Sequence, residues 1–206
     1  MTPDDILRHI DSGRPWPDTA TLPADAGAAY QTAIALRAAR TARGERPVGY
    51  KVGFTNRHIW PIYGVSAPIW GTVWDSTYTQ SDEGATLDLA HTCQPRLEPE
   101  VAFGLAATPP TGPTLDELFA CVDWIAPSFE VVQSHRPGWK CTLPETVADG
   151  ALHARLLVGR RTPIRDVAPD AASLNAAIPV AARTTLTVKQ KAQLLVYVIR
   201  RRFEVS

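Results

Sequence analysis

The chain has 206 residues, which is enough for one domain with a sizeable hydrophobic core. Its 21 basic and 21 acidic residues balance, so the sequence offers neither the basic field of a nucleic-acid-binding protein nor an acidic tail. The three cysteines are few, odd in number and widely spaced, which favours reduced thiols in a cytoplasmic protein over a disulfide framework or a zinc site.

The N-terminal residues 1–5 are acidic, unlike a signal peptide, and no apolar run approaches the roughly 20 residues that a membrane span needs. The 18 prolines argue against an all-helical bundle and favour short strands joined by fixed turns. We therefore expect a cytoplasmic protein that binds neither nucleic acid nor membrane. Its expected partners are a small molecule and further copies of the chain.

Three stretches carry the signals of helices. The first, residues 2–13, opens on a capping threonine followed by proline and closes on a glycine. The second, residues 25–43, is alanine-rich, with larger apolar residues at helical spacing. The third, residues 114–125, opens on a capping box and ends before Pro127.

Residues 47–54 form a strand candidate in which valine, tyrosine and phenylalanine alternate with glycine and lysine. Lys51 points away from the apolar face, and the glycines on either side allow close approach of backbone or ligand. An exposed lysine that blunts a sheet edge is the alternative interpretation of this pattern.

Residues 96–105 form the most informative strand. With period two, the face that begins with Leu97 is apolar and is expected to pack on the core, whereas Glu98 and Glu100 lie on the other face. Their carboxylates are about 6.6 Å apart along the strand. Like charges this close repel, and more strongly in a partly dry site, so they either face water or hold a cation.

A third glutamate, Glu130, lies in the mostly apolar strand candidate 128–133, where a lone charge is unfavourable unless it is paired or bound to a metal. With Glu98 and Glu100 it makes an oxygen-only set, which suits Mg²⁺ or Mn²⁺ better than zinc or copper. His153, next to a strand candidate at 154–159, is either a general base or a hydrogen-bonded structural residue.

Towards the C-terminus, residues 184–188 and 194–199 are β-type runs. No internal repeat or linker divides the chain, so we expect one domain, residues 1–206. Five motifs follow one another along the chain: Gly49–Thr55, Pro68–Gly71, Pro95–Phe103, Phe129–Val132 and Thr146–Asp149. In this order and spacing they resemble the 2-keto-4-pentenoate hydratase and 4-oxalocrotonate decarboxylase family of the fumarylacetoacetate hydrolase superfamily.

The resemblance implies an α+β fold, a mixed β-roll or barrel-like sheet with flanking helices, as in the C-terminal domain of fumarylacetoacetate hydrolase. Residues 1–45 would be a helical N-terminal part, residues 46–160 the β core with the metal site, and residues 161–206 a divergent tail. It also implies Mg²⁺ or Mn²⁺ bound by the three glutamates, Lys51 as the active-site lysine, and a homo-oligomer.

The activity implied by the resemblance is hydration of a 2-hydroxy-2,4-dienoate to a 4-hydroxy-2-keto acid in aromatic catabolism. The metal would act as a Lewis acid and template, with Lys51 as proton donor or electrostatic clamp. A 4-oxalocrotonate-type decarboxylase or a C–C hydrolase on the same scaffold is the alternative, because the core motifs do not separate these reactions.

The sequence departs from the family at several places. Family hydratases carry an acid after the second motif, and Asp75 lies near that position as a catalytic candidate. Residues 150–152 lack the expected asparagine and hydroxyl residue, for which His153 is the substitute candidate. Residues 161–206 do not match the further barrel strands of the family. We therefore expect a truncated product and an incomplete fold with an exposed sheet edge, partly covered by residues 194–199.

This divergent tail keeps two other interpretations open. One is a catalytically weak relative that binds metal or a keto acid, or pairs with a full-length partner, without turnover. The other is a small-molecule-binding module that uses no metal.

Overall fold

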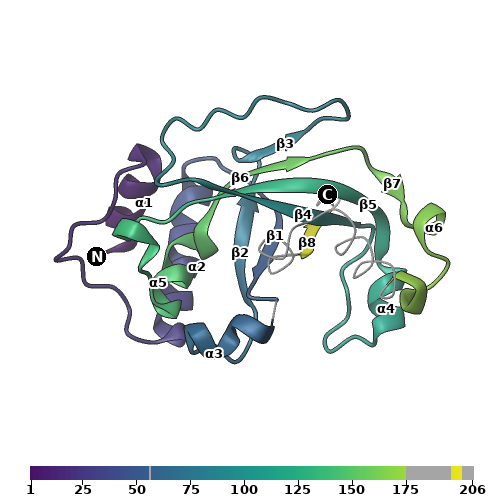
Figure 1. Cartoon of the computed structure of the whole chain (residues 1–206), viewed down its shortest axis with the longest axis horizontal. Coiled ribbons are helices and arrows are strands. Elements are labelled where there is room, and N and C mark those ends of the chain that lie inside the picture. The colour runs from purple at the N-terminus through teal and green to yellow at the C-terminus, as the bar shows by residue number, and fades with distance from the viewer. Residues whose placement is uncertain (56, 175–195, 201–206) are drawn as a thin grey trace.

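The computed structural model describes residues 1–55, 57–174 and 196–200 (Figure 1). The helices are α1 (Pro3–Ser12), α2 (Ala26–Ala42), α3 (Trp60–Tyr63), α4 (Leu115–Ala120), α5 (Leu143–Ala148) and α6 (Ile164–Val167). The strands are β1 (Pro47–Gly53), β2 (Ile69–Trp74), β3 (Tyr78–Gln80), β4 (Arg96–Leu105), β5 (Val122–Val132), β6 (His153–Val158), β7 (Thr162–Pro163) and β8 (Val196–Arg200). The β-type run predicted at 184–188 lies outside the described residues.

The strands form one mixed sheet in the order β2-β1-β8-β4-β5-β6-β3, with β7 paired to β5. Antiparallel pairs dominate, and β8 runs parallel to β4 while β3 runs parallel to β6. The predicted α+β class and mixed sheet are therefore confirmed. In the part of the chain that the structure describes, β2 and β3 are the two ends of an open sheet and no barrel closes.

The helices form two groups: α1, α2 and α5 gather beside β1 and β2, whereas α4 and α6 lie near the end of β5 that is far from them (Figure 1). The side chain of Thr2 caps α1 as the sequence predicts, and the side chain of Asp25 caps α2. The core on this side comprises buried residues from α1, α2, β2 and α5, among them Ile6, Leu36 and Val147. None of the described helices is both long and apolar enough to cross a membrane.

The predicted helix 114–125 is too long. Helix α4 ends at Ala120, and residues 122–125 already belong to β5, where Ile125 pairs with Phe103 and Trp124 with Gly104 of β4. The apolar spacing is compatible with a helix, but pairing along the whole of β4 overrides this local preference.

The alternation predicted for β4 is right, and its apolar face is buried at Phe103, which packs in the core with Ile164. The prediction is wrong for the start of the strand, where the glutamate face is the buried one. Glu98 and Glu100 are buried, with 9% and 4% of their surface exposed, whereas Leu97 is 62% exposed. In β1 likewise, Lys51 is buried. The reason is that Lys51 reaches Glu130 of β5, a strand that is not a neighbour of β1 in the sheet, so the polar faces of these strands look inward at one another.

Candidate metal centre

Strand register brings the three glutamates together. Glu98 of β4 lies directly opposite Glu130 of β5, and Glu100 follows two residues later on the same face of β4. One carboxylate oxygen from each residue lies within 4.8 Å of the others, and Glu130 has no exposed surface. The sequence predicts these three residues as one ligand set, and the structure brings them together.

The electrostatics of this cluster favour a cation. Burial raises the pKa of Glu98 to about 7, Lys51 lowers it in part, and the neighbouring Glu130 raises it further. Three converging carboxylates in a site without sulfur or imidazole ligands match the preference of Mg²⁺ and Mn²⁺ for oxygen. The donor set therefore fits a hard divalent metal, with Glu98, Glu100 and Glu130 as the residues that would hold it.

Lys51 is the cation that faces the glutamates. Its Nζ donates to the carbonyl oxygen of Ala151 at 2.8 Å and lies 3.1 Å from Glu130 Oε2. The side chain is buried, so the alternative of an exposed edge lysine is wrong. A buried ion pair of this kind fixes geometry more than it stabilises the fold.

His153 contacts the same glutamate from the start of β6. Its Nδ1 lies 2.8 Å from Glu130 Oε1, and its Nε2 lies 2.8 Å from the Thr77 hydroxyl. Burial lowers the pKa of His153, which keeps the ring neutral at neutral pH. With Glu130 as the acceptor, the proton belongs on Nδ1, a tautomer assigned from these partners. Both ring nitrogens are thus engaged.

A tight turn, Gly150–Leu152, holds the partner of Lys51. Ala151 and Leu152 both adopt left-handed backbone conformations, with φ of +57° and +66°, which cost about 1–2 kcal/mol each outside glycine. Gly71 of β2 packs against this turn: a Cβ at Gly71 would lie 2.5 Å from the Gly150 carbonyl oxygen. Strain of this kind next to Lys51 is typical of functional sites.

A buried histidine–aspartate pair, missed by the sequence analysis, anchors this turn. Asp149 Oδ1 lies 2.6 Å from His135 Nδ1, and its Oδ2 accepts from the His135 backbone N–H at 3.0 Å. The Leu152 N–H donates to the Asp149 carbonyl, and the Gln133 N–H donates to that of Leu152. The sequence shows that Asp149 directly precedes the turn, but it gives no sign that His135 is the partner of Asp149.

Ser128 was also missed. It pairs directly with Glu100 across β4 and β5, and its hydroxyl is buried without a hydrogen-bond partner among the described residues. The sequence does contain a signal for Ser128. It precedes Glu130 by two residues in a strand, so the two side chains must lie on the same face.

Asp75 lies elsewhere. It follows β2, where its carboxylate accepts from the Arg46 backbone N–H at 2.9 Å and from Arg46 Nε at 2.8 Å. These contacts lower the pKa of Asp75. Asp75 is not among the residues that the structure brings to the glutamates.

Comparison with known proteins gives several relatives, although no family model matches the chain. A 4-oxalocrotonate decarboxylase of Pseudomonas sp. is 38% identical over 124 residues, 60% of this chain and 48% of the relative. A 2-hydroxyhexa-2,4-dienoate hydratase of Comamonas testosteroni is 33% identical over 134 residues, 65% and 51% of the two chains. A 2-keto-4-pentenoate hydratase of Paraburkholderia xenovorans is 33% identical over 126 residues, which are 61% of this chain and 46% of the relative.

Among solved structures, 4-oxalocrotonate decarboxylase from Pseudomonas putida G7, complexed with magnesium and adipate, superposes with a TM-score of 0.69 at 24% identity. The match covers 80% of this chain and 64% of that one. A second structure of this enzyme, with calcium and acetate, gives the same TM-score. At this identity the likeness shows the fold alone. The chain spans about half the length of the curated relatives it matches, and these matches confirm the family resemblance inferred from its motifs.

Proposed function

We propose a function for this chain from its kinship with the 2-keto-4-pentenoate hydratase and 4-oxalocrotonate decarboxylase family. The chain acts as a divalent-metal-dependent hydratase that adds water to a 2-hydroxy-2,4-dienoate. The observation that carries the proposal is the convergence of three buried glutamates beside a buried lysine, Lys51.

Each residue has a role in this proposal. Glu98, Glu100 and Glu130 hold Mg²⁺ or Mn²⁺, which when bound supplies Lewis acidity and a template for the carboxylate and C2 oxygen of the substrate. Lys51, held by the Ala151 carbonyl, presents its ammonium beside the site, where it stabilises negative charge on the C2 oxygen. His153 orients Glu130 through its Nδ1–H and acts as a positioning residue.

The reaction balances with water as the only co-substrate. The 2-hydroxyl loses its proton and C5 gains one, which converts the dienol into a 2-keto-3-enoate. Water then adds its oxygen to C4 and a proton to C3, giving the 4-hydroxy-2-keto acid. Lys51 Nζ is the proton carrier in this scheme, because it is the buried ammonium closest to the glutamates.

The test is loss of the ultraviolet absorbance of a 2-hydroxypenta-2,4-dienoate after addition of the folded protein. We expect turnover with Mg²⁺ or Mn²⁺ and none after chelation. A folded sample that consumes no dienol with any divalent metal would contradict the hydratase proposal.

A second candidate is decarboxylation, favoured by the 38% identity to a 4-oxalocrotonate decarboxylase. In this reaction the bond between C5 and the C6 carboxylate breaks, CO₂ leaves, and the electron pair is delocalised onto the C2 oxygen, whose protonation gives the dienol. Lys51 and the bound metal would stabilise the negative charge on that oxygen. Release of CO₂ from a 4-oxalocrotonate, without hydration of the monocarboxylic dienol, would identify this activity and exclude the first.

We further propose that the chain is one domain with the β-roll of the fumarylacetoacetate hydrolase superfamily, and that it forms a homo-oligomer. The outer face of β4 and β5 supports association, because Leu97 and Phe129 on neighbouring strands are 62% and 43% exposed. Exposed apolar side chains that gather on one face often mark an interface between subunits.

A further inference from the structure

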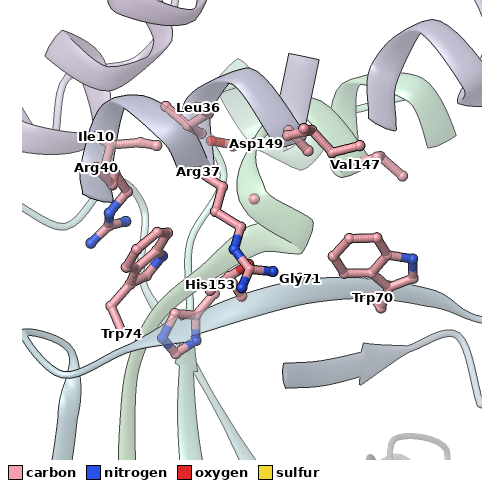
Figure 2. Close-up of a pocket in the computed structure, with 14 residues that line it drawn as sticks. Ile10, Leu36, Arg37, Arg40, Trp70, Gly71, Trp74, Val147, Asp149 and His153 are labelled. Carbon is pink, nitrogen blue, oxygen red and sulfur yellow. The ribbon is translucent and has the colours of Figure 1, made fainter. Parts of the chain in front are cut away.

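A cavity of about 300 Å³ lies between helix α2 and strand β2 (Figure 2). Its walls include Ile34, Leu36 and Arg37 of α2, Trp70 and Trp74 of β2, and Val147 of α5. None of the three glutamates of the candidate metal centre lines it. Its volume is at the lower end of the range for small-molecule sites.

Arg37 reaches from α2 into this cavity, and its head lies between Trp70 and Trp74 (Figure 2). Its Nη1 donates to the Tyr50 hydroxyl at 2.9 Å, and the guanidinium lies 5.4 Å from the centre of the Tyr50 ring. Among the described residues it has no ion-pair partner. A guanidinium carries five N–H donors, so most of them remain for a ligand.

The other charged groups in the wall, Arg40 and Asp149, already have partners. Arg40 makes two hydrogen bonds to Glu45, at 2.9 and 2.6 Å, and stacks over Trp74. Asp149 is buried and accepts two hydrogen bonds from His135. Arg37 is therefore the group that determines which ligand charge the cavity favours, and it favours an anion.

Aromatic and aliphatic side chains form much of the rest of the wall. Trp70 stacks on Tyr30 with ring centres 5.1 Å apart and 20° between the planes, so its indole is held in place. Trp70 and Ile34 are 38% and 50% exposed, which puts them where a ligand can enter from solvent. A planar hydrocarbon can lie on the indole while its charged end meets the guanidinium in a bidentate pair.

We propose that this cavity binds a small carboxylate with a planar unsaturated or aromatic body. The cavity shares His153 with the surroundings of the candidate metal centre but none of the three glutamates. Arg37 binds the carboxylate and Trp70 supports the planar body. The inference does not depend on the proposed function, because it invokes neither the metal nor turnover.

The test is ¹⁹F NMR titration of the whole chain with 4-fluorobenzoate in the presence of EDTA, which prevents chelation by a metal at the glutamates. We expect binding with a Kd of about 1 mM, typical of a ligand with ten heavy atoms. R37Q should raise the Kd at least about tenfold, since it removes the charge that pairs with the carboxylate. The matched control R8Q removes an exposed arginine on α1 and should leave the Kd unchanged.

Neutral 4-fluorobenzamide tests the same claim on the unaltered protein, so the result does not depend on how well R37Q folds. We expect it to bind at least about tenfold more weakly than the benzoate. Equal affinity for the two probes, equal affinity in R37Q, or no benzoate binding up to about 20 mM would each overturn the proposal.

Discussion

At the scale of single residues, Glu98 makes stability depend on pH. Its pKa rises from 4.5 unfolded to about 7 folded, so between these values only the folded state holds the proton. The contribution of Glu98 is therefore complete only below pH 4.5, and stability falls by about 2 kcal/mol as the pH rises from 5 to 7. The pKa of Glu45, lowered to about 2 by its arginine partners and Ser76 against the effect of burial, changes stability only below this window.

The prediction is a negative slope of unfolding free energy against pH in the metal-free protein, measured by urea denaturation with EDTA between pH 5 and 7. Glu98→Gln removes the titrating group and should flatten the curve. A wild-type curve that is flat or rises over this window would contradict the buried position of Glu98.

Lys51 gives the second prediction at this scale. Lys51→Met leaves Glu130 buried without its cation, which should destabilise the metal-free protein by about 3 kcal/mol. Saturating Mn²⁺ should restore part of this loss, since the metal replaces the missing positive charge. Thermal unfolding with and without Mn²⁺ measures both effects, and Lys140→Met, at an exposed lysine, is the control. An equal loss in the two variants would argue against the role of Lys51.

At the scale of elements, the sequence predicts helices α1, α2 and α4 and strands β1, β4, β5, β6 and β8, although not where all of them end. It does not predict the short helices α3, α5 and α6 or the strands β2, β3 and β7. The cap of α1 is local, so Thr2 reveals it from the sequence. The boundary between α4 and β5 depends on pairing with β4 from another part of the chain, and residues 122–125 are therefore misassigned. The buried faces of β1 and β4 follow from the contact between Lys51 and Glu130, which apolar patterning alone cannot predict.

The same distinction explains the site. Glu98, Glu100 and Glu130 stand out because charges in otherwise apolar strands are unfavourable unless they are paired or bound to a metal, and because all three offer carboxylate oxygens. His135 and Asp149 escape notice because each is ordinary alone, and only the fold brings them within 2.6 Å.

The turn at Gly150–Leu152 provides a prediction at the element scale. His135→Asn keeps an N–H donor near the position of Nδ1, whereas His135→Leu removes it and leaves Asp149 buried with one donor fewer. We expect H135L to lose about 1.5–3 kcal/mol of stability and H135N to lose less. Chemical denaturation compares the two variants. If H135N is as unstable as H135L, packing against Trp16 matters more than the hydrogen bond.

At the scale of the whole molecule, the outer face of β4 and β5 predicts self-association. Leu97→Glu places a charge at the exposed apolar position and should shift the protein to a smaller species in sedimentation velocity. Leu89→Glu, at a half-exposed leucine outside the sheet, is the matched control and should leave assembly unchanged. A wild-type chain that sediments as a monomer at all concentrations would remove the basis of this prediction.

Titration with Mn²⁺, followed by electron paramagnetic resonance of the free ion, tests directly whether the three glutamates form a metal centre. We predict one tight site per chain, weakened at least about a hundredfold by Glu100→Gln because one of three charged ligands is lost. Asp75→Asn is the control. In the wild type the Asp75 carboxylate pairs with Arg46, so this variant should bind Mn²⁺ as the wild type does. Mn²⁺ binding that is absent in the wild type, or unchanged in Glu100→Gln, would contradict the account.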